Sequence, residues 1–330
     1  MSHIPKRQLG ANGPMVGAIG FGGMSIAGAY GPTNIDDGLA ALDAAHTAGI
    51  DFWDTANIYG MGQSETIMGQ YLAQSGADVV LATKASIVPG PPRHYRNDAD
   101  HLRSELEQSL TRLGRDKVEL FYIHRREAER PIEEVVETLA GFIAEGLIDG
   151  YGLSEVAPYT IRRAHAVHPC RAVQNEYSLW SRMPELGVIQ ACTDLGVAFI
   201  PFSPLGRGAF GHHFPPRGDM GAGDLRKSYP RFTEPNYSAN RQAVEAFGAF
   251  AASRGWTVPA AALAWVLDRD PDMIPIPGTR HAAHVGDWLA ACDIAFTDAD
   301  RAEIARLLPP GFAHGDRYND AHSIGPERFC

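Results

Sequence analysis

The sequence predicts a closed barrel of eight parallel strands, each followed by a helix, and three observations support this prediction. Short apolar runs alternate with stretches of helical periodicity along the chain, and eight such pairs are recognisable. The length of 330 residues is normal for one barrel of this kind. Polar side chains that carry chemistry follow successive strands, at the end of a barrel where such loops converge. We therefore predict a single α/β domain, a (β/α)8 TIM barrel, over residues 1–330.

The first half of the chain supplies a hairpin and four strand–helix pairs. Residues 7–9 and 15–16 flank the turn sequence GANGP, so residues 1–17 are predicted to form an N-terminal β-hairpin. Gly49 and Gly114 stand where two helices are expected to end. The periodicity predicts strands at 18–21, 50–53, 79–83 and 119–123, and helices at 35–47, 65–74, 98–113 and 132–145.

The second half repeats this pattern with one long interruption. Residues 205–239, after the seventh strand, show little periodicity, and a loop of this length is usually functional or mobile. We expect this loop to lie over the mouth of the barrel, and the tail at 309–330 to be irregular. The predicted strands are 150–153, 172–174, 197–202 and 273–276, and the predicted helices are 159–168, 185–195, 242–253, 259–267, 281–291 and 298–308.

The overall composition excludes several classes of partner. The formal net charge of −10 disfavours nucleic acid and anionic membranes, although a few local cations can still hold an anionic cofactor. The N-terminus lacks the apolar segment of a signal peptide, and no apolar run is long enough to span a bilayer, so we expect a cytoplasmic protein. The four cysteines are widely spaced, which predicts free thiols and no metal site.

Four side chains at successive predicted strand ends point to proton transfer. They are Asp54 and Tyr59 in DFWDTANIYG, Lys84 after VVLAT, and His124 after VELFYI. A free phenol is a poor acid, with a pKa near 10, and a neighbouring ammonium such as Lys84 lowers that pKa. Asp54 can orient Lys84, and His124 can donate a hydrogen bond to a carbonyl oxygen. Any one of these residues alone would usually be structural, but the set favours catalysis.

Such a site protonates a carbonyl oxygen, and the carbonyl carbon must receive a hydride from elsewhere. Side chains cannot supply a hydride, so the site requires a redox cofactor. A phosphate-binding barrel isomerase is a weaker hypothesis, because it leaves the tyrosine, lysine and histidine unexplained.

Six segments in order resemble the aldo-keto reductase family. DFWDTANIYG, LATK and FYIHR are similar to its active-site segments, and QNEYSL, PFSPLGRG and IPIPGTR to its cofactor segments. The resemblance runs from about Leu9 to about Trp288 and is greatest to bacterial pyridoxal reductases and plant auxin-induced reductases. It implies a barrel plugged at the bottom by the N-terminal hairpin, and reversible reduction of an aldehyde or ketone with NADP(H), with NAD(H) as the weaker alternative.

The glycine-rich stretch at 206–211 needs a separate interpretation. It matches G-x-G-x-x-G and follows a predicted strand, but a Rossmann fingerprint should open a helix, and GHHFPP at 211–216 cannot start one. We therefore reject a Rossmann fold. In the family that the chain resembles, this loop clasps the diphosphate of the cofactor, with Arg207 as a nearby cation.

The resemblance assigns the remaining cofactor contacts by position. Phe202 would stack on the nicotinamide, and Ser154 and Gln174 would bind its carboxamide, although Glu155 replaces a frequent asparagine next to Ser154. The full predicted set comprises Met24, Asp54, Ser154, Gln174, Phe202, Ser203, Pro204, Leu205, Gly206, Arg207, Gly208, Gly278, Thr279, Arg280, His284 and Asp287.

The segment after the eighth strand favours NADP. Gly278, Thr279 and Arg280 offer helix-start amides, a hydroxyl and a guanidinium, which suit a phosphate monoester such as the 2′-phosphate. Relatives carry arginine where this chain has His281 and asparagine where it has Trp288. The sequence therefore does not determine how strongly the 2′-phosphate is bound or which residue contacts the adenine.

The substrate is predicted only as a small carbonyl compound. Met24 and Arg125 should face the mouth together with Tyr59 and His124. Arg125 and its neighbour Arg126 either recognise an anionic substrate or form salt bridges with surrounding acids. The alternative function is a cofactor-binding regulatory subunit of the same fold with little turnover. The sequence indicates neither the preferred direction of the reaction nor an interface between subunits.

Overall fold

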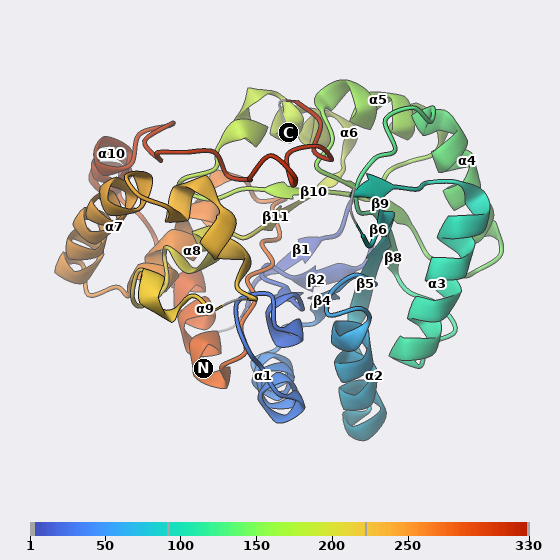
Figure 1. Cartoon of the computed structure of the whole chain (residues 1–330), viewed down its shortest axis with the longest axis horizontal. Coiled ribbons are helices and arrows are strands. Elements are labelled where there is room, and N and C mark those ends of the chain that lie inside the picture. Colours follow the sequence, from blue (N-terminus) through green and yellow to red (C-terminus); the bar gives the residue numbers. More distant parts are fainter. Residues whose placement is uncertain (1–3, 91–92, 222, 329–330) are drawn as a thin grey trace.

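The computed structural model describes residues 4–90, 93–221 and 223–328 and confirms the predicted barrel. Parallel strands occupy the centre and helices surround them (Figure 1). The sheet has the strand order β11-β10-β9-β8-β5-β4-β3, so each strand pairs with its neighbour in sequence. Its strands are β3 (Phe21–Gly22), β4 (Phe52–Asp54), β5 (Val80–Ala85), β8 (Leu120–Ile123), β9 (Tyr151–Ser154), β10 (Ala172–Glu176) and β11 (Ala198–Phe202).

The predicted eighth strand at 273–276 closes the barrel without forming a full strand. It pairs with β11 through two parallel bridges, Phe199 to Met273 and Phe202 to Ile276. On its other side the carbonyls of Pro275 and Pro277 accept hydrogen bonds of 2.9 and 2.8 Å from the amides of Gly20 and Gly22. The prolines lack N–H donors, so this segment can bond only at alternate residues on either side.

The N-terminal hairpin lies where the resemblance placed it. Its strands β1 (Lys6–Gln8) and β2 (Met15–Gly17) are antiparallel. Leu9 and Val16 are fully buried and belong to the apolar cluster inside the barrel, together with Phe52 and Leu120. The hairpin therefore plugs the end of the barrel where the strands begin; residues 1–3 of the expected 1–17 segment lie outside the described residues.

Most predicted helices are present, with small shifts at their ends. The side chain of Asp98 accepts a hydrogen bond from the amide of His101 at the start of α3, and Gly114 ends that helix with a positive φ of 64°. The helices are α1 (Ile35–Thr47), α2 (Gln63–Ser75), α3 (Ala99–Leu113), α4 (Ile132–Ala144), α5 (Pro158–Val167), α6 (Val188–Leu195), α7 (Asn236–Ser253), α8 (Val258–Arg269), α9 (Val285–Cys292) and α10 (Asp298–Leu307).

Two predicted boundaries are wrong. The first strand is Phe21–Gly22 rather than 18–21, because Gly20 and Gly22 bond to the closing segment rather than along a longer strand. Helix α7 begins at Asn236 instead of 242, so the long loop after β11 ends at residue 235 and contains only short 3-10 turns.

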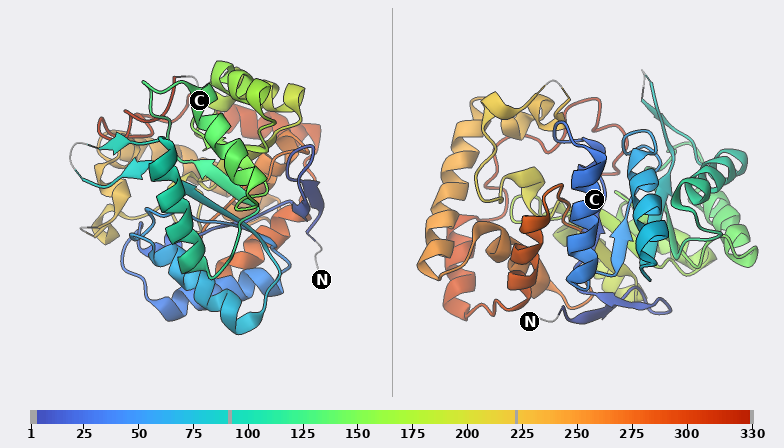
Figure 2. Two further views of the ribbon diagram at one scale, coloured as in Figure 1. Left: turned by 90° about the vertical axis from the view of Figure 1, so that its right-hand side faces the viewer. Right: turned by 90° about the horizontal axis from the view of Figure 1, so that it is seen from below.

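One further element of the mouth was not predicted from the sequence. Strands β6 (Ile87–Val88) and β7 (His94–Tyr95) form a small antiparallel hairpin between β5 and α3. This hairpin, the loop after β11 and the tail lie on the same side of the molecule, opposite the N-terminal hairpin (Figure 2, left). Over residues 309–328 the tail contains neither helix nor strand.

Two further sequence expectations concern cysteines and membranes. Cys170 and Cys192 are buried free thiols, Cys292 is a half-buried free thiol, and Cys330 lies outside the described residues. Among the helices that the structure describes, none combines the length and the apolar character needed to cross a bilayer.

Candidate active site

The four side chains predicted to transfer a proton lie together at the carboxyl ends of three neighbouring strands. Asp54 ends β4, Lys84 lies near the end of β5, and His124 directly follows β8. Tyr59 belongs to the loop after β4. The Lys84 ammonium lies 5.0 Å from the centre of the Tyr59 ring, and the rings of Tyr59 and His124 meet edge to face at 5.7 Å. We refer to these four residues as the tetrad.

Asp54 and Lys84 form a buried ion pair behind the tyrosine. Lys84 donates hydrogen bonds to the carboxylate of Asp54 and, at 2.6 Å, to the carbonyl of Thr55. Gln174 donates a further bond of 2.8 Å to the second oxygen of Asp54. Burial raises the pKa of Asp54 and lowers the pKa of Lys84, and the contact between the two groups opposes both shifts.

The electrostatics of Tyr59 differ from the sequence-based expectation. Desolvation of its hydroxyl, followed by the charge of Asp54, raises the pKa of Tyr59, with Arg125 acting in the opposite direction. The net shift of the Tyr59 pKa is therefore upward, whereas the sequence predicted that Lys84 would lower this pKa. Tyr59 is consequently a neutral phenol at physiological pH, which is the form that can donate a proton.

His124 is neutral as well. Burial, and then the charges of Arg125 and Lys84, hold the pKa of His124 well below its usual range. Its Nδ1 is buried and has no hydrogen-bond partner among the described residues. A neutral imidazole offers one N–H donor. His124 can therefore hydrogen-bond to an oxygen atom without competing with Tyr59 as an acid.

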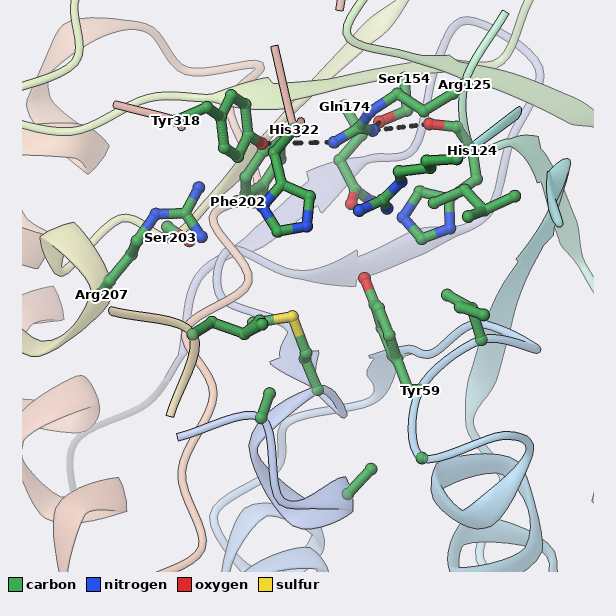
Figure 3. A pocket seen from close by; sticks show the side chains of 18 of the residues that line it. Tyr59, His124, Arg125, Ser154, Gln174, Phe202, Ser203, Arg207, Tyr318 and His322 are labelled. Carbon is green, nitrogen blue, oxygen red and sulfur yellow. Dashed lines mark hydrogen bonds between the residues drawn. The ribbon is translucent and has the colours of Figure 1, made fainter. Parts of the chain in front are cut away.

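A cavity of about 330 Å³ opens in front of the tetrad, and we call it the mouth cavity. Figure 3 shows the Tyr59 hydroxyl pointing into it, with His124 and Arg125 on one side and Tyr318 and His322 on another. Other lining residues are Ile58, Ile87, Arg93, Tyr95, Ser154, Arg207, Leu225 and Tyr229. The lining combines aromatic and apolar surface with several cations.

A second cavity of about 260 Å³ runs from Tyr59 toward Arg280 and His284, and we call it the groove. Six residues line both cavities: Met24, Tyr59, Gln174, Phe202, Ser203 and Arg207. Every residue predicted to bind cofactor lines the groove except Ser154, Gly206 and Asp287. The two cavities thus meet at Tyr59.

The glycine-rich loop beside the groove does not open an α-helix. Gly206–Gly208 is a single 3-10 turn, and among the described residues the next α-helix is α7, which argues against the Rossmann interpretation as the sequence does. Arg207 has a positive φ of 58° and directs its guanidinium to Glu176, 2.6 Å away. The sequence did not predict this carboxylate partner, which neutralises Arg207 within the protein.

At the far end of the groove lies Arg280, which differs from Arg207 because its partners are backbone carbonyls. Arg280 donates to the backbone carbonyls of Tyr30 and Gly31 at 3.2 and 3.1 Å and has no ion pair with a carboxylate of the described residues. Thr279 shares a hydrogen bond of 2.9 Å with His284. Backbone carbonyls orient the guanidinium of Arg280 without neutralising it.

Asp287, which was predicted to bind the cofactor, and Trp288, which replaces the asparagine expected at the adenine contact, do not line the groove. Asp287 accepts from Thr257 at 2.7 Å and pairs with His212 at 2.8 Å, outside the lining of the groove. Trp288 is 1 % exposed and packs on Phe21 in the core. Trp288 is therefore a packing residue of the core.

Ser154 and Gln174 occupy adjacent strand ends, in register with each other. Within the protein, Gln174 binds Asp54, and Ser154 accepts a 3.1 Å bond from Arg125. Phe202 ends β11 and lines both cavities. The nicotinamide contacts implied by the resemblance stay a prediction; Ser154 lines the mouth cavity and not the groove.

The sequence analysis missed the contributions of the tail and of the β6–β7 hairpin. Tyr318 and His322 line the mouth cavity from a segment without periodicity, so no sequence signal could have placed them. Arg93 and Tyr95 come from the hairpin, whose strands of two residues each, Ile87–Val88 and His94–Tyr95, are too short to show strand periodicity.

The composition of the groove fits an anionic dinucleotide. Among the described residues, its lining carries Arg207, Arg226 and Arg280 and one carboxylate, that of Asp54, which is paired with Lys84. Glu176 and Asp224 pair with Arg207 and Arg226 from behind the lining, so the charge of Arg280 is left in excess. The loop after β11 meets the loop after β3 beside the mouth cavity, where the amide of Leu225 donates to the carbonyl of Ala29 at 3.3 Å. A long cationic groove that leads to a neutral phenol can hold a phosphate-rich cofactor next to a proton donor.

Comparison with known proteins agrees with this geometry. The sequence model of the Aldo/keto reductase family matches residues 18–309. A probable aldo-keto reductase 1 of Glycine max is 36% identical over 326 residues, covering 96% of this chain and 92% of the relative. The aldo-keto reductase yakc [NADP(+)] of Schizosaccharomyces pombe is 35% identical over 323 residues, covering 96% and 94%.

Solved structures show the same architecture. The glycerol dehydrogenase AKR11B4 of Gluconobacter oxydans superposes with a TM-score of 0.83 at 26% identity, covering 92% of this chain and 94% of that one. An aldo/keto reductase of Klebsiella pneumoniae, solved in complex with NADP and acetate, superposes with a TM-score of 0.73 at 25% identity, covering 96% and 99%.

Proposed function

This chain belongs to the aldo/keto reductase family, and we propose that it uses NADPH to reduce an aldehyde or ketone to the corresponding alcohol. The reverse oxidation with NADP⁺ uses the same site. The observation that carries this proposal is the meeting of the two cavities at Tyr59, because it joins a cationic groove to a neutral proton donor. The sub-branch within the family stays a prediction.

Bound NADPH supplies the hydride that the carbonyl carbon receives. The protein supplies the proton, and the oxygen of the substrate takes it from the hydroxyl of Tyr59. The reaction thus adds one hydride and one proton across the C=O bond. Because its pKa is raised, Tyr59 is protonated at neutral pH, and its hydroxyl can serve as the proton donor.

The other members of the tetrad hold the acid and its acceptor in place. Lys84 lies against the Tyr59 ring, where its ammonium stabilises the phenolate left after proton transfer. Asp54 keeps Lys84 in position. His124, which is neutral, donates a hydrogen bond to the substrate oxygen and so orients the carbonyl toward Tyr59.

The residues of the groove would hold the cofactor. Arg280 and Thr279 suit its 2′-phosphate, the loop at 204–208 suits its diphosphate, and Phe202 with Gln174 suits its nicotinamide. Arg280 is the residue that favours NADPH over NADH, because no carboxylate of the described residues neutralises it.

The proposal is tested by following NADPH consumption with a panel of aldehydes and ketones. We expect multiple turnovers with at least one of them, and we expect Tyr59→Phe to lower kcat by at least about 100-fold, the size of a lost general acid. The phenyl ring remains, so the Kd for NADPH should stay close to that of the wild type.

The same experiment separates the alternatives. A protein that binds NADPH tightly but completes no second turnover with any carbonyl compound would be a cofactor-binding regulatory subunit. Wild-type kcat in Tyr59→Phe, measured when chemistry limits the rate, would remove Tyr59 from the role of acid.

A further inference from the structure

We propose that the mouth cavity is built for a carbonyl compound that also carries a negatively charged oxygen group, held by Arg93 and Arg125. This inference rests on the proposed function and names the class of its substrate. It follows from four features of the cavity: its charge balance, the contacts of Arg125, the position of Arg93, and the separation of both residues from the groove.

The first feature is the charge balance of the lining. Arg93, Arg125 and Arg207 line the mouth cavity, and no aspartate or glutamate of the described residues does. This is unusual in a chain whose formal net charge is −10. The cavity is therefore a local region of positive charge, which attracts anions and repels cations.

The carboxylates directly behind the lining do not change this balance. Glu176 pairs with Arg207 at 2.6 Å, and Glu155 pairs with Arg317 at 2.6 Å. The carboxylates of Glu176 and Glu155 thus neutralise the charges of Arg207 and Arg317. The positive charges of Arg93 and Arg125 remain without a carboxylate partner among the described residues.

The second feature is the set of contacts that Arg125 makes. Arg125 and Arg207 are the two buried arginines of the described residues, 8 % and 7 % exposed, and only Arg207 has a carboxylate partner. Arg125 donates to neutral groups instead: the carbonyl of His124 at 2.6 Å, Ser154 at 3.1 Å and the hydroxyl of Tyr318 at 3.3 Å. The bonds to Ser154 and Tyr318 are drawn in Figure 3.

A buried charge without a counter-ion is costly, and proteins retain one where a ligand supplies the opposite charge. The neighbouring Arg126 shows the contrast, because it pairs with Glu327 at 2.6 Å and is explained by the structure alone. Of the two arginines that follow His124, only Arg125 therefore lacks a carboxylate partner and can pair with the anionic group of a ligand.

The third feature is the position of Arg93. It directly precedes β7 of the mouth hairpin and is half-buried, its Nε has no hydrogen-bond partner, and it forms no ion pair with a carboxylate of the described residues. Its charge reaches into the cavity: after burial, Arg93 is the largest influence that lowers the pKa of His322 to about 4. The positive charges of Arg93 and Arg125 thus both face the mouth cavity.

The fourth feature separates this site from the groove. Neither Arg93 nor Arg125 lines the groove, whose far end has Arg280 for the cofactor. Ile58, Ile87, Leu225 and Tyr229 add apolar and aromatic surface to the mouth cavity, which suits the organic body of a substrate. A guanidinium binds carboxylate and phosphate oxygens in the same forked geometry.

The test compares matched pairs of probes that differ only in charge. We would measure kcat/KM with NADPH for 4-formylbenzoate and 4-oxobutanoate against their methyl esters, and for 4-formylphenyl phosphate. One charge-assisted bond changes binding by roughly 10- to 150-fold, so at least one anionic probe should exceed its ester by at least about 10-fold. Equal values for every acid and its ester would overturn the inference; the phosphate probe shows which oxyanion is preferred.

Variants assign the effect to the cavity. Arg93→Gln should reduce the ratio of acid to ester by about 10-fold or more, and Arg93→Lys should restore part of it. Arg241→Gln removes one exposed charge of α7 and should leave the ratio unchanged. If Arg93→Gln weakened NADPH binding as much as it weakened the acid, Arg93 would serve the cofactor and the inference would be wrong.

A binding measurement keeps this inference distinct from the proposed function. Calorimetry with benzoate and with benzamide requires no turnover, and we expect benzoate to bind at least about 10-fold more tightly. Preference for benzoate without any reductase activity would contradict the proposed function alone. Reduction of esters and acids at equal rates, with no preference for benzoate, would contradict the anion site alone.

Discussion

At the scale of single residues, the tetrad depends on an ion pair that water does not reach. Lys84 is completely buried and Asp54 is 1 % exposed. A pair of this kind adds little net stability compared with apolar packing, but losing one partner is expensive. The sequence predicted both residues and their contact, because each lies at the end of a strand whose neighbour is fixed by the barrel order.

We expect Lys84→Met to lower the free energy of unfolding by about 3–5 kcal/mol, because it leaves the carboxylate of Asp54 buried without a cation. Reduction should slow as well, because the Tyr59 phenolate loses its neighbouring charge. Urea denaturation and steady-state kinetics measure the two effects. The double variant Asp54→Asn/Lys84→Met should regain stability but not activity; a fully stable and active single variant would disprove both roles.

Arg280 controls the choice of cofactor at the same scale. We expect Arg280→Ala to weaken NADPH by roughly 10- to 150-fold more than NADH, because only NADPH offers a phosphate to this guanidinium. Fluorescence quenching gives the Kd of both cofactors for both proteins. Arg280→Lys should retain part of the selectivity. Equal losses for the two cofactors would show that the 2′-phosphate is held elsewhere in the groove.

At the scale of elements, the barrel strands could be predicted and the walls of the mouth cavity could not. Segments such as LATK and FYIHR carry their function at strand ends, which short-range apolar patterns locate. Tyr318 and His322 lie in a tail whose position depends on ion pairs distant in sequence. Arg317 in that tail reaches Glu155 across 162 residues, and no local pattern encodes such a contact.

Arg317 is the main polar anchor of the tail beside the mouth cavity. It pairs with Glu155 at 2.6 Å and lies 3.6 Å from Glu176. We expect Arg317→Met to lower stability by about 1.5–3 kcal/mol, the range for a charge-assisted hydrogen bond, and to raise KM for the carbonyl substrate more than the Kd for NADPH. Limited proteolysis should cleave the tail faster. Arg328→Met, an exposed change in the same tail, is the control; if both variants behave alike, Arg317 is not an anchor.

At the scale of the whole molecule, the predicted single domain has a thermodynamic consequence. If residues 1–330 fold as one unit, calorimetry should show one cooperative transition. NADPH at about 100 times its Kd should stabilise the protein by about 2.7 kcal/mol and raise Tm by roughly 5 °C. Two transitions, of which NADPH shifts only one, would contradict the single domain.

The tail and the β6–β7 hairpin form part of the wall of the mouth cavity, whereas the tetrad belongs to the barrel. This division has an evolutionary consequence. A mutation at Tyr318, His322 or Arg93 alters what the cavity accepts while the ion pair of Asp54 and Lys84 stays as it is. Descendants of this protein can therefore exchange one substrate for another by changes confined to two peripheral segments, without passing through a form that has lost its chemistry.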